Sequence, residues 1–234
     1  MDKDINFETY LVINPKYFLI TVVDKKDKSK VYEKKESILK GPDNLDLHLL
    51  DEFLKKTVFE IEKKIENFLN NIFLILDYNI FFPVKISIKK NLSGKLITAE
   101  NLSYLLNETK KDCHKTFLGK KIIHIILDRY LVDEKSYSSL PLETSCKSLS
   151  LDISFLCLSN EEIKKFEEIL KEYHILLTKI FSAEYVRSLF NQNNQDLILM
   201  TMLVKDGYNK NEVEVLEKKQ QNNGLFERFF HLFR

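Results

Sequence analysis

The sequence predicts an α+β (α/β-like) fold, in which short strands alternate with amphipathic helices along 234 residues. Apolar side chains recur at helical spacing through residues 45–70, whereas residues 84–88 alternate apolar and polar side chains as a half-buried strand does. Apolar residues make up 44% of the chain and aromatic residues 12%, which is enough to form a core. We therefore expect a folded protein rather than a disordered one.

The first part of the chain is expected to contain a hairpin, a long helix and further strands. Asn14, Pro15 and Lys16 separate two apolar runs and predict the hairpin turn. The long helix covers residues 45–70, after a break at residues 41–44 that contains Gly and Pro. The predicted strands are residues 10–13, 18–23, 30–34, 73–76 and 84–88.

The later part of the chain continues this alternation. Thr98 is a suitable N-cap for a helix to about residue 113, and Ser159 opens a capping-box pattern for a helix to about residue 173. A short helix is expected at residues 182–189. The predicted strands are residues 122–127 with an extended continuation at 130–133, then 148–158, 175–180, 197–204 and, more weakly, 213–216.

Charge and cysteine content exclude several classes of protein. The 36 basic and 35 acidic residues are mixed along the chain, which argues against a nucleic-acid binder with a basic stripe. Cys113, Cys146 and Cys157 lack the spacing of a metal site. We expect them to be reduced thiols in a cytoplasmic protein.

Catalytic motifs are nearly absent. The five histidines are scattered, and His124 lies within an apolar strand pattern that favours a core histidine with one hydrogen-bond partner. Cys113 and His114 are adjacent, but a nucleophile pair does not require adjacency in sequence. With only five glycines there is no Gly-rich phosphate loop. We expect no enzyme activity, no catalytic residue, no cofactor and no metal.

Residues 225–234 form the most distinctive segment. The polar stretch before them, residues 219–224, predicts a flexible linker. An amphipathic helix with aromatic and basic residues often lies on a membrane surface, although a helix that packs on the protein core is the alternative. On a helix one side would carry Leu225, Phe226, Phe229, Phe230, Leu232 and Phe233, with Arg228 and Arg234 among the polar residues opposite.

Residues 97–189 resemble FtsA, the bacterial actin-like cell-division protein. The family opens a helix with ITxED, where this chain has Ile97-Thr-Ala-Glu-Asn101, and it continues with HVLPQEYxVD, where this chain has His124-Ile-Ile-Leu-Asp-Arg-Tyr-Leu-Val-Asp133. The family's alternating strand matches residues 149–155, its capped helix matches residues 160–173, and its LASAxAVL matches residues 181–186. The resemblance implies a partial actin fold with an inserted strand–helix–strand-strand subdomain.

The same resemblance implies that nucleotide binding has been lost. Residues 11–16 occupy the place of the family's first phosphate loop, LDIGTSK, but Val12, Asn14 and Pro15 replace its Asp, Gly and Thr. After Leu189 the second loop, DIGGGTTD, has no counterpart. FtsA also carries a linker followed by an amphipathic membrane-targeting helix, the layout of residues 219–234, and this favours the membrane interpretation of that segment.

These inferences predict five parts and one leading function. The parts are an actin-like region (1–96), the inserted subdomain (97–180), an actin-like remnant (181–218), the linker (219–224) and the membrane-targeting helix (225–234). The predicted function is a non-catalytic, self-associating adaptor on the inner face of the cell membrane that binds lipid and division proteins, including FtsZ. The alternatives are a soluble scaffold, whose helix binds a protein groove or its own core, and a residual ATPase.

Overall fold

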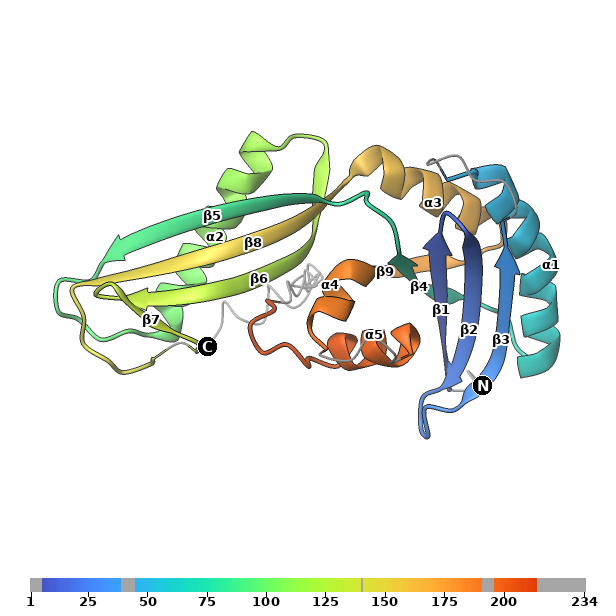
Figure 1. The fold of residues 1–234 in the computed structure, drawn as a ribbon, viewed down its shortest axis with the longest axis horizontal. Helices are drawn as coiled ribbons and strands as arrows, with labels where there is room; N and C mark the ends of the chain where they lie inside the picture. Colours follow the sequence, from blue (N-terminus) through green and yellow to red (C-terminus); the bar gives the residue numbers. More distant parts are fainter. Residues whose placement is uncertain (1–5, 39–44, 140, 191–195, 214–234) are drawn as a thin grey trace, which may run out of the picture.

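Two β-sheets, placed one after the other along the molecule, organise the chain (Figure 1). The computed structural model describes residues 6–38, 45–139, 141–190 and 196–213. The predicted break at 41–44, the linker at 219–224 and the amphipathic helix at 225–234 therefore lie outside the described residues, as does most of the weak strand expected at 213–216.

The first sheet has five strands in the order β3-β2-β1-β4-β9. The strands β1, β2 and β3 form an antiparallel meander, whereas β4 is parallel to β1 and β9 is parallel to β4. The predicted hairpin at residues 14–16 is confirmed as the β1–β2 turn. The strands are β1 (Phe7–Asn14), β2 (Tyr17–Asp24), β3 (Lys30–Ser37), β4 (Asn71–Leu76) and β9 (Leu176–Ser182).

Helices cover both faces of the first sheet. Along β1, Leu11 and Ile13 face a core formed with α1 (Leu47–Ile65) and α3 (Asn160–Glu172). Tyr10 and Val12, which point the opposite way, face a core formed with α4 (Ala183–Ser188) and α5 (Leu197–Lys205). This strand is apolar at consecutive positions because both of its faces are buried.

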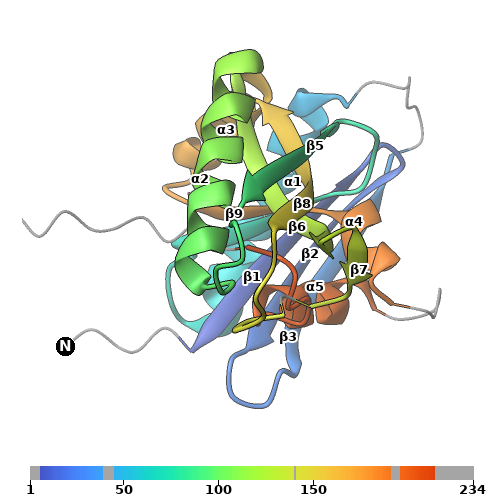
Figure 2. The ribbon, with the colours of Figure 1, turned by 90° about the vertical axis from the view of Figure 1, so that its left-hand side faces the viewer.

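The second sheet is antiparallel, in the order β5-β8-β6-β7, and α2 (Ala99–Thr116) packs along one of its faces (Figure 2). Its opposite face is polar: Asp152 accepts hydrogen bonds from Ser87 and Arg129 across three neighbouring strands. The strands are β5 (Phe82–Asn91), β6 (Lys120–Val132), β7 (Lys135–Tyr137) and β8 (Ser148–Ser159).

Sheet membership does not follow the expected division at residues 97 and 180. The strand β5 lies before residue 97 but pairs with β8 in the second sheet. The helix α3 lies before residue 180 and β9 crosses that position, but α3 packs on the first sheet and β9 belongs to it. These pairings join residues far apart in sequence, so local patterns do not reveal them. The inserted unit runs from β5 to β8 and contains the predicted strand–helix–strand-strand order.

The strand predicted at residues 197–204 is wrong, because this segment is the helix α5. Asp196 caps it by accepting a hydrogen bond from the backbone N–H of Ile198 at 2.8 Å. Leu199 and Leu203, four residues apart, are its exposed positions, as a helical face requires. The cause of the error is that a short, continuously apolar run does not distinguish a buried strand from a buried helix.

The predicted starts of two helices are confirmed. Thr98 and Asn101 form the capping box of α2, in which each side chain accepts a hydrogen bond from the backbone of the other residue. Ser159 caps α3 by accepting a hydrogen bond from the backbone N–H of Glu161 at 3.2 Å. The long helix α1 ends at Ile65, before the expected residue 70, because Glu66 adopts a left-handed conformation.

Candidate functional site

The first place to examine is the edge of the first sheet where β1 and β4 end. Open sheets with parallel strands bind ligands outside the carboxyl ends of those strands. Asn14 is the last residue of β1 and Asp77 directly follows β4, so the two meet at this edge. The hairpin turn after Asn14 also occupies the place that the FtsA resemblance assigns to the first phosphate loop.

Asp77 is held at this edge by three side chains. Arg187, from α4, donates two parallel hydrogen bonds to its carboxylate, at 2.5 Å to Oδ1 and 2.9 Å to Oδ2. Asn14 donates to Oδ2 at 3.0 Å, and the Tyr17 hydroxyl donates to the same oxygen at 3.3 Å. Burial raises the pKa of Asp77, but the hydrogen bonds from Arg187 and Asn14 outweigh it, so that the pKa lies below its usual value.

This network engages the polar side chains at the edge with one another. Both oxygens of Asp77 accept hydrogen bonds from protein groups, and Asn14 also accepts one from the backbone N–H of Lys16 within the turn. Within the described part of the chain there is no group of three or more His, Cys, Asp or Glu side chains placed to hold a metal ion.

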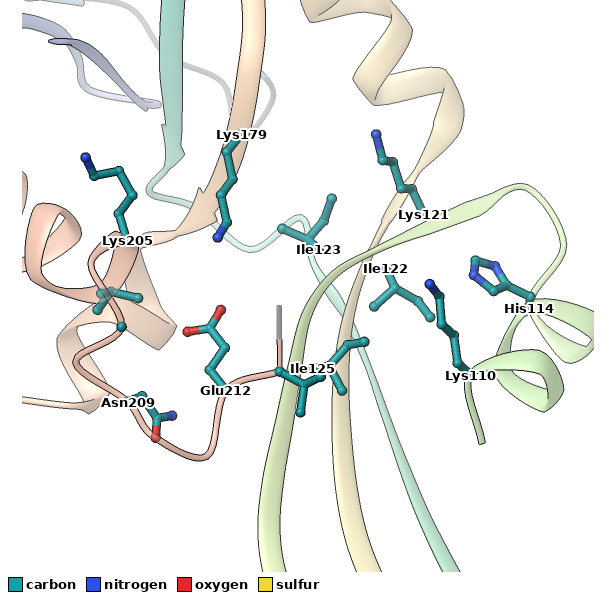
Figure 3. Close-up of a pocket in the computed structure, with 13 residues that line it drawn as sticks. Lys110, His114, Lys121, Ile122, Ile123, Ile125, Lys179, Lys205, Asn209 and Glu212 are labelled. Atoms are coloured by element: carbon teal, nitrogen blue, oxygen red, sulfur yellow. The ribbon is translucent and has the colours of Figure 1, made fainter. Parts of the chain in front are cut away.

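A second candidate is a cavity of about 430 Å³ between the two sheets (Figure 3). Its walls come from β6 and α2 on one side and from β9, the end of α5 and the segment after α5 on the other. Figure 3 shows Lys110 and His114 approaching from α2, Lys179 from β9 and Glu212 from the segment after α5. Ile122, Ile125 and Val213 contribute apolar surface.

A buried hydrogen-bond cluster beside this cavity connects the two sheets. The Nε2 atom of His124, on β6, accepts a hydrogen bond from the backbone N–H of Ser182 at the end of β9. The Nδ1 atom therefore carries the proton in the neutral ring and donates to Glu212 at 2.8 Å. Tyr185 donates to the other oxygen of Glu212 at 2.8 Å, and Asn209 donates to the Tyr185 hydroxyl.

The residues around Glu212 also form backbone hydrogen bonds between β6 and the segment after α5. The N–H of Leu127 donates to the carbonyl of Asn211 at 2.8 Å, and the N–H of Val213 donates to the carbonyl of Ile125 at 2.9 Å. Burial raises the pKa of Glu212, but the hydrogen bonds from His124 and Tyr185 outweigh it, so that the pKa lies below its usual value. The carboxylate of Glu212 is thus a structural anion between the two sheets.

The structure locates some of the residues that the sequence singled out. His124 is a buried core histidine as predicted, although it has two hydrogen-bond partners rather than one. Cys113 points into the core and contacts Cys157, whereas the adjacent His114 lines the cavity, so these neighbours face opposite ways. The predicted membrane-binding residues, Leu225, Phe226, Arg228, Phe229, Phe230, Leu232, Phe233 and Arg234, lie outside the described residues.

No protein-family model matches the chain, and no curated protein matches it. Solved structures are similar in fold. The PilM–PilN type IV pilus biogenesis complex aligns with a TM-score of 0.46 and 9% identity over 76% of this chain and 48% of that chain. The cytoplasmic domain of EpsL, an inner membrane component of the type II secretion system of Vibrio cholerae, gives 0.41 and 7% over 80% and 60%.

A third similar structure is a Bacteroides thetaiotaomicron protein described as having an actin-like ATPase fold and unknown function, with a TM-score of 0.29 and 11% identity over 78% of this chain and 54% of that chain. The chain thus spans between 48% and 60% of the length of these structures.

The predicted α+β class is confirmed, and the described elements fit a partial actin fold with an inserted subdomain. No helix in the described ranges is long and apolar enough to cross a membrane.

Proposed function

We propose that this protein is a non-catalytic, FtsA-like adaptor that holds proteins of the cell envelope at the inner face of the membrane. The Asp77–Arg187 ion pair supports this function most directly, because it fills the sheet edge at which an actin-like ATPase would hold phosphate. A protein that keeps the scaffold but occupies this edge with its own side chains is suited to binding partners rather than to hydrolysis.

Two of the similar structures come from assemblies of the cell envelope, and one of these two is an inner membrane component. One belongs to a pilus biogenesis complex and another to an inner membrane component of a secretion system. We propose the same kind of setting for this chain, with division proteins, including FtsZ, as the partners that the FtsA resemblance implies.

Membrane attachment in this proposal is the role of residues 225–234. Full burial of one Leu or Phe side chain contributes about 1.5–3 kcal/mol, but burial at a membrane surface is partial, and ordering of a ten-residue helix opposes it. One copy therefore binds weakly, and self-association strengthens attachment through effective concentration.

Co-sedimentation with liposomes tests the attachment. We expect the full chain to pellet with anionic vesicles, and Phe229→Glu combined with Phe233→Glu, or deletion of residues 225–234, to abolish pelleting without unfolding. A matched control is Phe59→Glu with Phe68→Glu, since these phenylalanines are 70% and 73% exposed on the first domain, by which we mean the first sheet with the helices that cover it. Unchanged pelleting after the deletion would refute the membrane role, and loss of stability would favour a helix that packs on a protein surface.

Calorimetry with ATP and Mg²⁺ tests the non-catalytic part of the proposal. We expect no saturable heat with the full chain. Saturable binding that is lost in Asp77→Asn would instead support a residual ATPase.

A further inference from the structure

The turn between α2 and β6 exposes an apolar side chain. Leu118 is 82% exposed, more than any other large apolar residue among those the structure describes. It precedes Gly119, whose φ of +76° is one that glycine adopts without strain. The ring of the neighbouring Phe117 lies 5.4 Å from the ring of Phe82, which is itself 41% exposed. Apolar surface is therefore open to solvent at this end of the second sheet.

Five lysines flank this turn in the sequence, and together with Leu118 we call them the basic tip. They are Lys110, Lys111 and Lys115 on α2, and Lys120 and Lys121 at the start of β6. Lys111 is paired with Glu108 at 3.1 Å, and the Lys120 ammonium lies 4.4 Å from the centre of the Phe82 ring. The other three lysines form no hydrogen bond or ion pair with another residue in the part of the chain that the structure describes.

The carboxylates near the basic tip do not neutralise it. The start of α3 lies next to the turn, because the N–H of Asn160 donates to the carbonyl of Gly119 at 2.8 Å. The two carboxylates at that start, Glu161 and Glu162, both interact with Lys165. Three carboxylates then remain for the five lysines of the tip: Glu108 and Asp112 on α2, and Glu167, which lines a small cavity with Lys121.

The chain that continues to residues 225–234 leaves the described structure beside the basic tip. Val213, the last described residue, lines the cavity between the sheets together with Lys110 and Lys121, two lysines of the tip (Figure 3). The intervening residues, 214–224, span at most about 40 Å. Residues 225–234 and the basic tip are therefore close enough to contact one surface at the same time.

We propose that the basic tip is a second contact with an anionic lipid bilayer, which presupposes the membrane setting proposed above. Lysines near an anionic leaflet are attracted electrostatically, and an exposed Leu among them enters the boundary between headgroups and acyl chains. Because the chain joins this contact to residues 225–234, each contact raises the effective concentration of the other at the surface. A nucleic acid would complement the lysines but not the exposed side chain of Leu118, so charge and apolar surface together favour lipid.

A fluorophore at the turn tests the contact directly. The chain contains no Trp, so Leu118→Trp introduces a single indole. With phosphatidylglycerol vesicles we expect its emission to shift to the blue and brominated acyl chains to quench it, whereas phosphatidylcholine vesicles should have no effect. The matched control is Leu142→Trp, because Leu142 is also exposed, at 53%, but lies near the opposite end of α2. Its emission should remain that of an indole in water.

Removal of charge tests the electrostatic part of the proposal. Lys115→Gln with Lys121→Gln should weaken binding to phosphatidylglycerol vesicles by at least about tenfold, and added salt should also weaken it. The control is Lys63→Gln with Lys64→Gln, which removes two exposed lysines of α1 and should leave binding unchanged. The circular dichroism of both variants should match that of the parent, since none of these four lysines has a polar partner among the described residues.

The two membrane contacts are separable by experiment. After deletion of residues 225–234 the basic tip alone should bind too weakly to pellet, but the emission of Leu118→Trp should still shift at high vesicle concentration. If the deletion has no effect on pelleting, the attachment proposed for residues 225–234 is wrong, and the indole and lysine variants still decide the role of the tip.

Two results would overturn the second contact. One is an indole at position 118 that stays in water at saturating phosphatidylglycerol, and the other is equal vesicle binding by Lys115→Gln with Lys121→Gln and by its control. Binding of a DNA duplex of about 20 base pairs that is lost in the same lysine variant, without a blue shift on vesicles, would assign the basic tip to nucleic acid instead.

Discussion

Arg187 and Asp77 are 110 residues apart in sequence and form a two-pronged ion pair at the carboxyl edge of the first sheet. The pair connects α4 to the end of β4 and closes the edge beside the β1–β2 turn. This one ion pair thus joins a helix on one face of the first sheet to the end of its strand β4.

Removal of Arg187 should destabilise the first domain. In Arg187→Met the carboxylate of Asp77, whose side chain is 13% exposed, keeps its charge but loses its principal partner. We expect a loss of about 1–3 kcal/mol in the free energy of unfolding, measured with urea. Lys111→Met is the control, since the ion pair of Lys111 with Glu108 is exposed and should contribute less than about 1 kcal/mol. Equal effects of the two changes would contradict this prediction.

The same pair predicts how stability depends on pH. The pKa of Asp77 in the folded protein is lowered, so its contribution is complete above the pKa of the unfolded chain, about 4, and is lost as pH falls through the folded value. Urea unfolding between neutral pH and about pH 3 should therefore show a smaller acid loss in Asp77→Asn than in the parent. If the free energy of unfolding falls equally with pH in the parent and in Asp77→Asn, other carboxylates determine the acid sensitivity.

His124 is expected to stabilise the contact between the two sheets. His124→Leu removes the donor to Glu212 and the acceptor for the Ser182 N–H, and should lower the free energy of unfolding by about 1–3 kcal/mol. His124→Asn, which retains a donor near the position of Nδ1, should cost less. His48→Leu is the control because the His48 side chain is 77% exposed. A neutral effect of His124→Leu would mean that the cluster does not hold the sheets together.

The three thiols should be unreactive in the folded protein. Cys113, Cys146 and Cys157 are all buried. Burial and the neighbouring Cys113 raise the pKa of Cys157 to about 12, and burial also raises the pKa of Cys113 and Cys146. With Ellman's reagent at neutral pH we expect slow reaction of the native protein and fast reaction of all three thiols in urea. Rapid reaction of a native thiol would indicate an opening that exposes it.

Local chemistry made much of the fold predictable. The helix starts at Thr98 and Ser159 follow from hydrogen bonds between residues only two or three positions apart. The helix α5 was missed because its run from Leu197 is apolar at almost every position, which hides the helical period. Thr201→Glu separates the two interpretations: Thr201 is fully buried in the helix, whereas a strand would place it beside the exposed Leu199 and Leu203.

Long-range partners explain why the candidate sites were not predicted. Asp77 directly follows a buried strand, which is a local signal for a functional or structural carboxylate, but nothing near it in sequence indicates Arg187. The His124–Glu212 contact joins residues 88 positions apart, and the four cavity lysines come from four separate elements. Spacing rules for one helix or one strand do not extend to such sets.

The return of residues 208–213 to β6 has a mechanical consequence. The inserted unit leaves the first domain after β4 and rejoins it before α3, and two such covalent crossings alone would form a hinge. The hydrogen bonds of Asn211 and Val213 with β6 add a third attachment point. A pulling force applied to the chain beyond Val213 would therefore act on the second sheet before it acted on α5. The second sheet would then transmit the force to the first sheet and would not rotate freely about the two crossings.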